Sequence, residues 1–237
     1  MRIDLFLVNK GYFESRSKAE YAISLNQVLV NGKIVTKNST EVNENDLIQI
    51  LPNTLKYVSK GGLKLEKALD YFHIDIQNKV CLDIGASTGG FTDCLLKHGA
   101  SLVYAIDVGR DQLHPSLKTD KRVYSFEETN FLSFDLNKLP HIDCITIDVS
   151  FVKVETILDR VINSFKDLIV IFLIKPQFEL GHIYIKNGVV KDQSLQMKVI
   201  NQIQNYLKDK NIQINPMIES PIKGGSGNTE YLTFIKI

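Results

Sequence analysis

The chain has 237 residues, of which 44% are hydrophobic and 23% are charged, and its formal net charge is +1. This composition is that of a soluble globular protein with one large or two small domains. The total charge does not indicate a nucleic-acid partner, but the distribution does. Residues 1–37 carry six basic and three acidic side chains, and residues 51–67 carry four basic side chains and one acidic.

Neither a disulfide framework, nor a metal site, nor a membrane segment is expected. The three cysteines are widely spaced, and the five histidines lack the spacing of metal ligands. Asp4 and Lys10 interrupt any signal-peptide core, and the longest apolar run, residues 168–174, is too short to span a bilayer as a helix. We therefore expect a cytoplasmic protein without metal or membrane. We also expect a monomer.

Two short helices are predicted at the N-terminus. Residues 2–10 form the first helix, which Gly11 ends. The pattern Ser17-x-x-Glu20 is typical of a capping box and predicts the start of the second helix. The apolar face of this second helix comes from Ala19, Ala22, Ile23 and Leu25.

A small sheet is predicted to follow these helices. Residues 28–35 read as a hairpin with Asn31-Gly32 as its two-residue turn, and residues 47–50 read as a closing strand. The core residues of the hairpin are expected to be Val28, Val30 and Ile34. Residues 1–50 would therefore form a small α+β domain.

A linker and a larger domain are predicted after residue 50. Residues 51–61 contain proline, serine and glycine and read as a linker, so that residues 62–237 form the second domain. The first helix of that domain directs Leu63, Leu69 and Phe72 towards a core.

Strands and helices alternate from residue 79 onward, which predicts a mostly parallel sheet. The predicted strands are residues 80–84, 102–106, 123–126, 142–147, 168–174, 212–219 and 231–237. The predicted helices are residues 91–97, 155–165 and 194–208. Seven strands with a late C-terminal pair indicate an α/β fold of the Rossmann-like kind found in methyltransferases that use S-adenosylmethionine (SAM).

A glycine-rich turn follows the first strand of this domain. Gly85, Gly89 and Gly90 let the backbone approach a ligand at the start of a helix, and Asp107 ends the next strand, where an acid can bind ribose hydroxyls. The dinucleotide fingerprint requires G-x-G-x-x-G, and the spacing here suits SAM better than NAD. A purely structural glycine turn is the alternative.

Two further charged residues end strands of the same sheet. Asp148 ends the fourth strand of the α/β domain and Lys175 ends the fifth. Ligands of open α/β sheets bind beyond the carboxyl ends of the strands, so these side chains should share a crevice with Gly85 and Asp107. No proline follows Asp148, which argues against methylation of an amino group.

Seven motifs together resemble one family. They are residues 59–65, 83–92, 105–109, 127–130, 148–151, 175–179 and 227–230. With them the chain resembles the TlyA family of ribosomal RNA 2′-O-methyltransferases, which are often called haemolysins and have an FtsJ-like catalytic domain. The resemblance implies an enzyme that transfers a methyl group from SAM to the ribose 2′-hydroxyl of a cytidine in rRNA. It favours the 23S rRNA of the large subunit, with 16S rRNA as the alternative, and rRNA within a ribosomal subunit as the partner.

The resemblance also assigns roles to individual residues. The catalytic residues would be Lys64, Asp148, Lys175 and Glu230. The cofactor-binding residues would be Gly85, Ser87, Thr88, Gly89, Gly90, Phe91, Asp107, Glu127, Asn130 and Asp148. The N-terminal domain resembles a small RNA-binding module of a ribosomal protein, and the RNA-binding residues would be Arg2, Arg16, Lys18, Lys33, Lys56 and Lys60.

Each of these residues alone has an ordinary interpretation. Lys64 would be a solvated helix residue, Asp148 a turn cap, Glu230 a surface acid and Phe91 a core residue. Their joint placement within the motifs favours function. The chain departs from the family at two places. Lys60 replaces a common arginine, and residues 181–190 are an unusual form of a basic loop that bears on the choice of substrate.

The role of Lys175 has two interpretations. A general base must be neutral at the moment of attack, and Asp148 and Glu230 would favour the charged form of Lys175. Lys64, the SAM sulfonium and burial would favour the neutral form. The family favours the base, and orientation of the hydroxyl is the alternative.

Two other functions compete with RNA methylation. A pore-forming haemolysin is disfavoured because no segment could span a membrane as a helix. A non-catalytic ribosome-assembly factor is disfavoured because Lys64, Asp148, Lys175 and Glu230 are all present.

Overall fold

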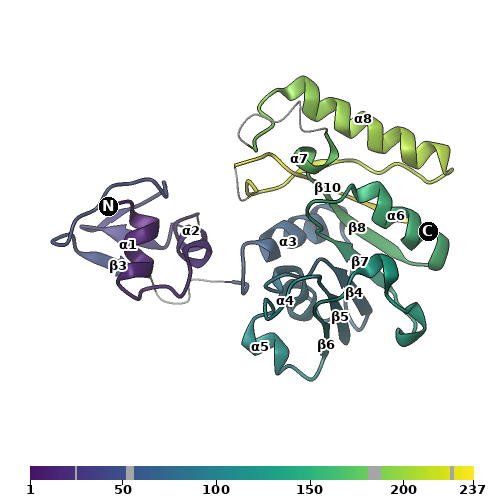
Figure 1. Ribbon diagram of the computed structural model, residues 1–237, viewed down its shortest axis with the longest axis horizontal. Coiled ribbons are helices and arrows are strands. Elements are labelled where there is room, and N and C mark those ends of the chain that lie inside the picture. The colour runs from purple at the N-terminus through teal and green to yellow at the C-terminus, as the bar shows by residue number, and fades with distance from the viewer. Residues whose placement is uncertain (25, 52–55, 181–187, 225–226) are drawn as a thin grey trace. The chain divides into compact units, whose positions relative to one another are not determined.

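The computed structural model describes residues 1–24, 26–51, 56–180, 188–224 and 227–237. The chain divides into two compact units, Met1–Lys60 and Gly61–Ile237, which are described separately (Figure 1). The linker expected over residues 51–61 includes residues 52–55, which lie outside the described ranges. Its limits therefore stay a prediction.

The N-terminal unit packs two helices and a three-stranded antiparallel sheet around one small core. Its elements are α1 (Ile3–Asn9), α2 (Arg16–Ser24), β1 (Val28–Val30), β2 (Lys33–Ile34) and β3 (Ile48–Ile50), with the strand order β2-β1-β3. Asn31 and Gly32 have φ angles of 52° and 75°, as the predicted two-residue turn requires. Of the predicted apolar face of α2, Ala19, Ala22 and Ile23 are buried, and Leu25 lies outside the described residues.

Two details of this unit differ from the sequence prediction. Ile34 is 55% exposed, and the next residue, Val35, enters the core in its place. The capping box on Ser17 is also wrong, because α2 already begins at Arg16. Ser15 precedes the helix, and its Oγ accepts a hydrogen bond of 3.4 Å from the Lys18 backbone N–H.

The second unit is built on a seven-stranded sheet with the order β6-β5-β4-β7-β8-β10-β9. Its strands are β4 (Val80–Ile84), β5 (Leu102–Ile106), β6 (Val123–Phe126), β7 (Cys144–Ile147), β8 (Ile169–Ile174), β9 (Ile218–Glu219) and β10 (Tyr231–Lys236). Strands β4 to β8 are parallel, whereas β10 runs antiparallel to both β8 and β9. This topology agrees with the predicted fold class.

The helices cover both faces of the sheet (Figure 1). They are α3 (Gly61–Phe72), α4 (Gly90–Lys97), α5 (Pro115–Lys118), α6 (Val154–Ser164), α7 (Pro176–Glu179) and α8 (Gln193–Asp209), with the 3-10 turns η1 (Phe131–Ser133) and η2 (Leu136–Lys138). Leu82 and Ile84 face a core that includes α6 and α8. Asp83 points to the opposite face, where it contacts Thr92 of α4. No helix within the described ranges is long and apolar enough to cross a membrane.

The strand predicted over residues 212–219 is much shorter in the structure. Only Ile218 and Glu219 pair with β10. Before them, Asn215 Nδ2 donates a hydrogen bond of 2.9 Å to the Phe234 carbonyl. Pro216 has no N–H to contribute to a ladder, so side-chain contacts replace the expected strand pairing there.

The strand ends place five charged or glycine residues at one edge of the sheet. Gly85, Asp107, Asp148 and Lys175 each follow directly after β4, β5, β7 and β8. Since β10 runs the opposite way, Glu230, which precedes it, lies at the same edge. The crevice predicted from the strand ends is therefore present in the fold.

Candidate active site

Lys64 and Glu230 form a buried ion pair at this edge. Lys64 lies in the first turn of α3, and its Nζ is 2.5 Å from Oε2 of Glu230. The two residues are only 6% and 3% exposed. The ordinary interpretations of Lys64 as a solvated lysine and of Glu230 as a surface acid are therefore wrong.

Asp148 and Lys175 form a second ion pair. Nζ of Lys175 is 2.5 Å from Oδ1 of Asp148 and donates a hydrogen bond of 3.1 Å to the Ser150 hydroxyl. Burial alone would raise the pKa of Asp148, but the charges of Lys175 and Lys64 outweigh it and hold that pKa below its usual value. Asp148 is therefore a carboxylate at neutral pH.

The two pairs form one polar cluster. The charge of Lys64 acts on Asp148 as well as on Glu230. Gln177 adds a hydrogen bond of 3.4 Å from its Nε2 to Oε1 of Glu230. Taking two ion pairs out of water costs free energy, and hydrophobic residues in their place would often stabilise a fold equally well. Stability alone therefore does not explain the two pairs. The cluster thus brings together all four predicted catalytic residues in an arrangement suited to holding and orienting a polar group.

Two glycines lie directly against this cluster. A Cβ on Gly85, whose φ is +87°, would lie 2.6 Å from the Asp148 carbonyl oxygen. A Cβ on Gly224 would lie 2.3 Å from Oε1 of Glu230. Gly85 therefore has a structural reason for its identity, in addition to any contact with a cofactor.

Asp107 organises the loops around the predicted cofactor site. Its Oδ2 accepts a hydrogen bond of 2.8 Å from the Ser87 backbone N–H, and its Oδ1 accepts one of 2.7 Å from Gly109. A carboxylate oxygen can accept more than one hydrogen bond, so both oxygens retain capacity for a ligand. Ser87 and Thr88 are exposed beside it.

The other predicted cofactor residues have internal contacts of their own. Oε1 of Glu127 accepts hydrogen bonds from the backbone N–H groups of Gln112 and Leu113, which, together with Lys118, hold the pKa of Glu127 below its usual value. Asn130 caps the turn η1 by accepting a hydrogen bond from Leu132. Gly89 and Gly90 start α4, and the buried side chain of Phe91 follows them, only 3% exposed.

Sequence reasoning missed two buried acids. Asp83 accepts hydrogen bonds from the hydroxyls of Thr92 and Thr146 at 2.7 and 2.8 Å, and burial raises its pKa to about 6. Glu179 accepts a hydrogen bond of 2.9 Å from the Val154 backbone N–H, and burial raises its pKa to about 7. Each acid had a signal in the sequence that could have identified it as buried. Asp83 lies inside an apolar strand, and Glu179 is the last residue of the motif 175–179.

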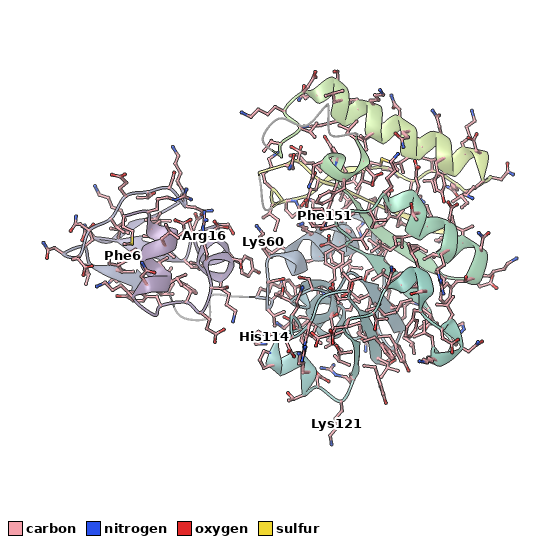
Figure 2. The ribbon with its side chains drawn as sticks, viewed as in Figure 1. Phe6, Arg16, Lys60, His114, Lys121 and Phe151 are labelled. Carbon is pink, nitrogen blue, oxygen red and sulfur yellow. The ribbon has the colours of Figure 1, made fainter. Side chains whose placement is uncertain are left out.

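An exposed aromatic ring lies beside the cluster. Phe151 follows Ser150, has a φ angle of +64° and is 91% exposed (Figure 2). Its ring centroid is 4.9 Å from that of Phe178. A bulky residue in the left-handed region is uncommon, so the surroundings hold this ring towards solvent at a local cost.

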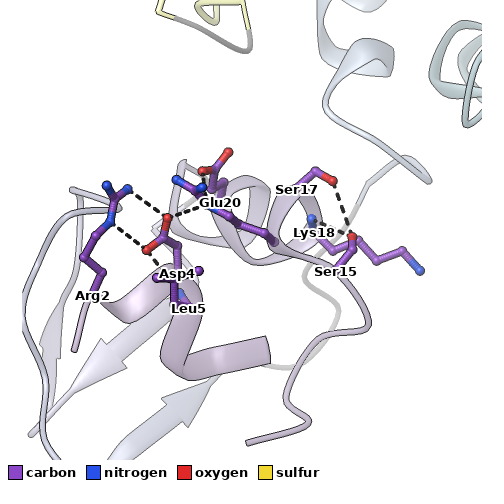
Figure 3. Close-up of polar contacts among 8 residues, drawn as sticks. Arg2, Asp4, Leu5, Ser15, Ser17, Lys18 and Glu20 are labelled. Carbon is purple, nitrogen blue, oxygen red and sulfur yellow. Dashed lines mark hydrogen bonds and ion pairs between the residues drawn. The ribbon is translucent and has the colours of Figure 1, made fainter. Parts of the chain in front are cut away.

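The predicted RNA-binding residues are only partly brought together. Arg2 contacts the carboxylate of Asp4 in the N-terminal unit (Figure 3). Arg16 contacts the same carboxylate. Lys18 pairs with Glu14, and Lys33 lies in β2. Of the two lysines predicted in the linker, Lys56 has its Nζ 5.7 Å from the centroid of the Tyr57 ring, and Lys60 is half-buried.

No metal site is found in the part of the chain that the structure describes. No three His, Cys, Asp or Glu side chains in those ranges are grouped so as to hold an ion. All three cysteines belong to those ranges, are buried and form no disulfide.

Comparison with known proteins gives matches over both units. Residues 57–236 match the family described as FtsJ-like methyltransferase, and residues 1–48 match the S4 domain. These matches confirm the predicted resemblance and fold class.

Three relatives are similar to nearly the whole chain. "Hemolysin A" of Brachyspira hyodysenteriae is 45% identical, and the match covers 98% of each chain. The "23S rRNA (cytidine-2'-O)-methyltransferase TlyA" of Campylobacter jejuni is 35% identical, over 99% of this chain and 98% of the relative. The "16S/23S rRNA (cytidine-2'-O)-methyltransferase TlyA" of Mycobacterium tuberculosis is 34% identical, over 99% of this chain and 89% of the relative.

Proposed function

The chain belongs to the FtsJ-like methyltransferase family, and from this premise we propose that it methylates the ribose 2′-hydroxyl of a cytidine in ribosomal RNA, with SAM as the donor. The observation that carries the proposal is the buried cluster of Lys64, Asp148, Lys175 and Glu230. Two relatives whose names state this reaction support it, since they match the chain over almost its full length.

The chemistry around Asp107 fits SAM. Its carboxylate oxygens still have capacity to accept hydrogen bonds from ribose hydroxyls, and the exposed residues Ser87 and Thr88 lie beside it. SAM, when bound, supplies a methyl group activated by a positive sulfonium. The remaining cofactor contacts would come from Gly85, Gly89, Gly90, Phe91, Glu127, Asn130 and Asp148.

The cluster would act on the hydroxyl. Methyl transfer to a ribose 2′-oxygen requires removal of its proton and alignment of the oxygen with the methyl carbon. Lys175 Nζ, which contacts Asp148 and Ser150, would accept that proton when neutral or orient the oxygen when charged. We favour the base role. A single-turnover pH–rate profile distinguishes the two, since only a base must lose its proton before attack.

The acceptor would be a nucleotide that is exposed or flipped out of its helix. A ribose inside a duplex cannot reach a buried cluster, so the cytidine must be presented to it. The exposed ring of Phe151 offers the kind of surface on which unpaired bases stack. Both relatives named above act on 23S rRNA, and the Mycobacterium protein also on 16S, so we propose 23S rRNA as the target with 16S as the alternative.

The test is methylation of isolated ribosomal subunits. The purified protein is incubated with large or small subunits and methyl-labelled SAM, and methylated nucleosides are mapped by mass spectrometry. We expect 2′-O-methylcytidine in the large subunit. Lys175→Ala should abolish it, and Lys208→Ala, which removes an exposed lysine of α8, should retain it. The absence of methylated cytidine from both subunits would contradict the proposal.

The alternative functions have their own tests. The name of the Brachyspira relative suggests lysis of membranes as an alternative function. Leakage from liposomes exposed to the detergent-free protein would support this alternative. Full biological rescue by an Asp148→Ala variant would favour a non-catalytic assembly factor. We expect neither outcome.

A further inference from the structure

Asp4 is a fully buried acid in a unit that is expected to bind RNA. It lies in the first turn of α1 and is 0% exposed. Arg2 donates to both of its oxygens, with Nε 3.1 Å from Oδ1 and a terminal nitrogen 2.9 Å from Oδ2. Arg16 donates from Nε to Oδ2 at 2.8 Å. One carboxylate therefore holds two guanidinium groups, one from the residue before α1 and one from the first residue of α2.

The two arginines stay accessible although their carboxylate does not. The side chains of Arg2 and Arg16 are 44% and 52% exposed. A guanidinium has five N–H donors, and the contacts with Asp4 use two from Arg2 and one from Arg16. Glu20 lies close to the same nitrogen, with its Oε1 3.1 Å from Nε of Arg16, and so takes up none of the terminal N–H groups of Arg16. Donors are left on both groups for a further acceptor.

Asp4 remains ionised while it holds them. Burial alone would raise its pKa, but the hydrogen bonds and charges of Arg2 and Arg16 outweigh burial and hold the pKa below its usual value. The side chain also accepts a hydrogen bond of 3.1 Å from the Leu5 backbone N–H. The carboxylate is thus fixed at the start of α1 and stays ionised at neutral pH, so that it holds both guanidinium groups.

Net charge cannot account for RNA binding by this unit. Residues 1–50 carry six basic and six acidic side chains, because the excess of basic residues over 1–37 is offset by Glu41, Glu44 and Asp46. Phosphate affinity in a neutral unit must come from how its cations are placed. Exposed arginines lose side-chain entropy when a ligand fixes them, and a prior fixed geometry reduces that loss.

We propose that Asp4 is a positioning residue that presents Arg2 and Arg16 as one preorganised pair for a phosphate group of the rRNA backbone. The inference rests on the proposed function, in which the S4 unit grips rRNA. Arginine pairs suit phosphate because their planar donors match its oxygens. The carboxylate sets the spacing of the pair and is not itself a contact of the RNA.

The sharpest test is Asp4→Asn in the intact chain. Charge counting predicts tighter RNA binding, because the change removes a negative charge. The positioning role predicts weaker binding, by about tenfold, because the guanidinium groups lose their common anchor. Binding to isolated large ribosomal subunits is measured over a salt titration. The logarithm of the binding constant falls linearly with the logarithm of the salt concentration. The magnitude of that slope should decrease by about one for each phosphate that the variant no longer neutralises.

The matched control is Glu44→Gln. It removes the same charge from the same unit, but Glu44 is exposed and pairs with Lys10. We expect binding by this variant to be unchanged or tighter. Equal behaviour of Asp4→Asn and Glu44→Gln would overturn the inference.

A second pair of variants covers the case in which Asp4→Asn fails to fold, which circular dichroism detects. Arg2→Lys and Arg16→Lys keep the charge but lose the fork of donors. Each should weaken binding, and the double variant should lose less than the sum of the two, since the pair binds as a unit. Parental affinity in both lysine variants would overturn the inference. Failure of the parent chain itself to bind subunits would instead refute the proposed function.

Discussion

Single residues decide whether the polar cluster can form. Lys64 and Glu230 are 166 positions apart in the chain and meet at 2.5 Å, and each is almost fully buried. A charged group that loses its partner in such a place is left unpaired, which is costly. Substitutions that displace one member should therefore affect the site as strongly as substitutions that remove it.

Gly224 provides a test that leaves every charged residue in place. A methyl group at this position would overlap Oε1 of Glu230, so Gly224→Ala should push that carboxylate away from Lys64. We expect methyl transfer to fall by at least about tenfold, the scale set by small misplacements in active sites. The measurement is single-turnover transfer, with a thermal melt as the control for folding. Normal transfer would show that the position of Glu230 does not matter.

A substitution at Phe151 can distinguish binding of the RNA acceptor from binding of the methyl donor. Its exposed ring is poised for stacking on an unpaired base, worth about 1–3 kcal/mol. Phe151→Ala should raise KM for the ribosomal subunit by roughly tenfold or more and leave KM for SAM unchanged. An equal change in both constants would mean that the ring supports the fold and not the substrate.

At the scale of elements, most strands were predictable from the sequence. Mainly apolar runs predicted β4, β5 and β8 to within a residue, because strands buried on both faces leave little choice of side chain. The prediction was wrong where pairing is set by distant partners. Residues 212–217 have strand-like composition, but a proline and side-chain contacts with β10 replace the ladder.

The candidate site shows the same division. Motifs and strand ends were enough to predict that Lys64, Asp148, Lys175 and Glu230 meet. Nothing in the sequence showed which lysine pairs with which acid, because that depends on the register of β10 beside β8. The contacts of Glu179 could not be predicted either, since they join two helices across the sheet edge.

Glu179 links α7 to α6 and should make stability depend on pH. Its folded pKa of about 7 lies above the ordinary glutamate value of 4.5, so the folded state holds a proton that the unfolded state releases. Stability from this group is present below pH 4.5 and is lost as the pH rises through 7, by up to about 3 kcal/mol. Glu179→Gln keeps the acceptor for Val154 and removes the titration.

The measurement is urea unfolding of both proteins between about pH 4.5 and pH 8. We expect Glu179→Gln to be more stable than the parent at the alkaline end and nearly equal to it at the acid end. Asp83 also has a raised pKa, so only the difference between the proteins reports on Glu179. Glu219→Gln, which removes an exposed acid that pairs with Lys223, should leave the pH dependence unchanged. A constant difference at all pH values would mean that Glu179 is ionised in the fold.

For the whole molecule, donor binding should be visible as a change in stability. A ligand at about 100 times its Kd stabilises the folded state by about 2.7 kcal/mol, which is roughly 5–10 °C in Tm for a unit of this size. SAM should raise the Tm of the parent by this amount. Asp107→Ala should show no rise, whereas Asp120→Ala, which removes an acid paired with Arg122, should retain it. If SAM raised the Tm of Asp107→Ala as much as that of the parent, the ribose of SAM would not bind at Asp107.

The late position of β10 has a consequence for the synthesis of the protein. The parallel strands and the turn from Gly85 to Gly90 are complete by residue 174, but Glu230 and the strand that follows it are synthesised after all of them. A polypeptide that stops before residue 230 therefore lacks the partner of Lys64 in the polar cluster. Under the proposed function, methyl transfer therefore requires that translation has passed residue 230.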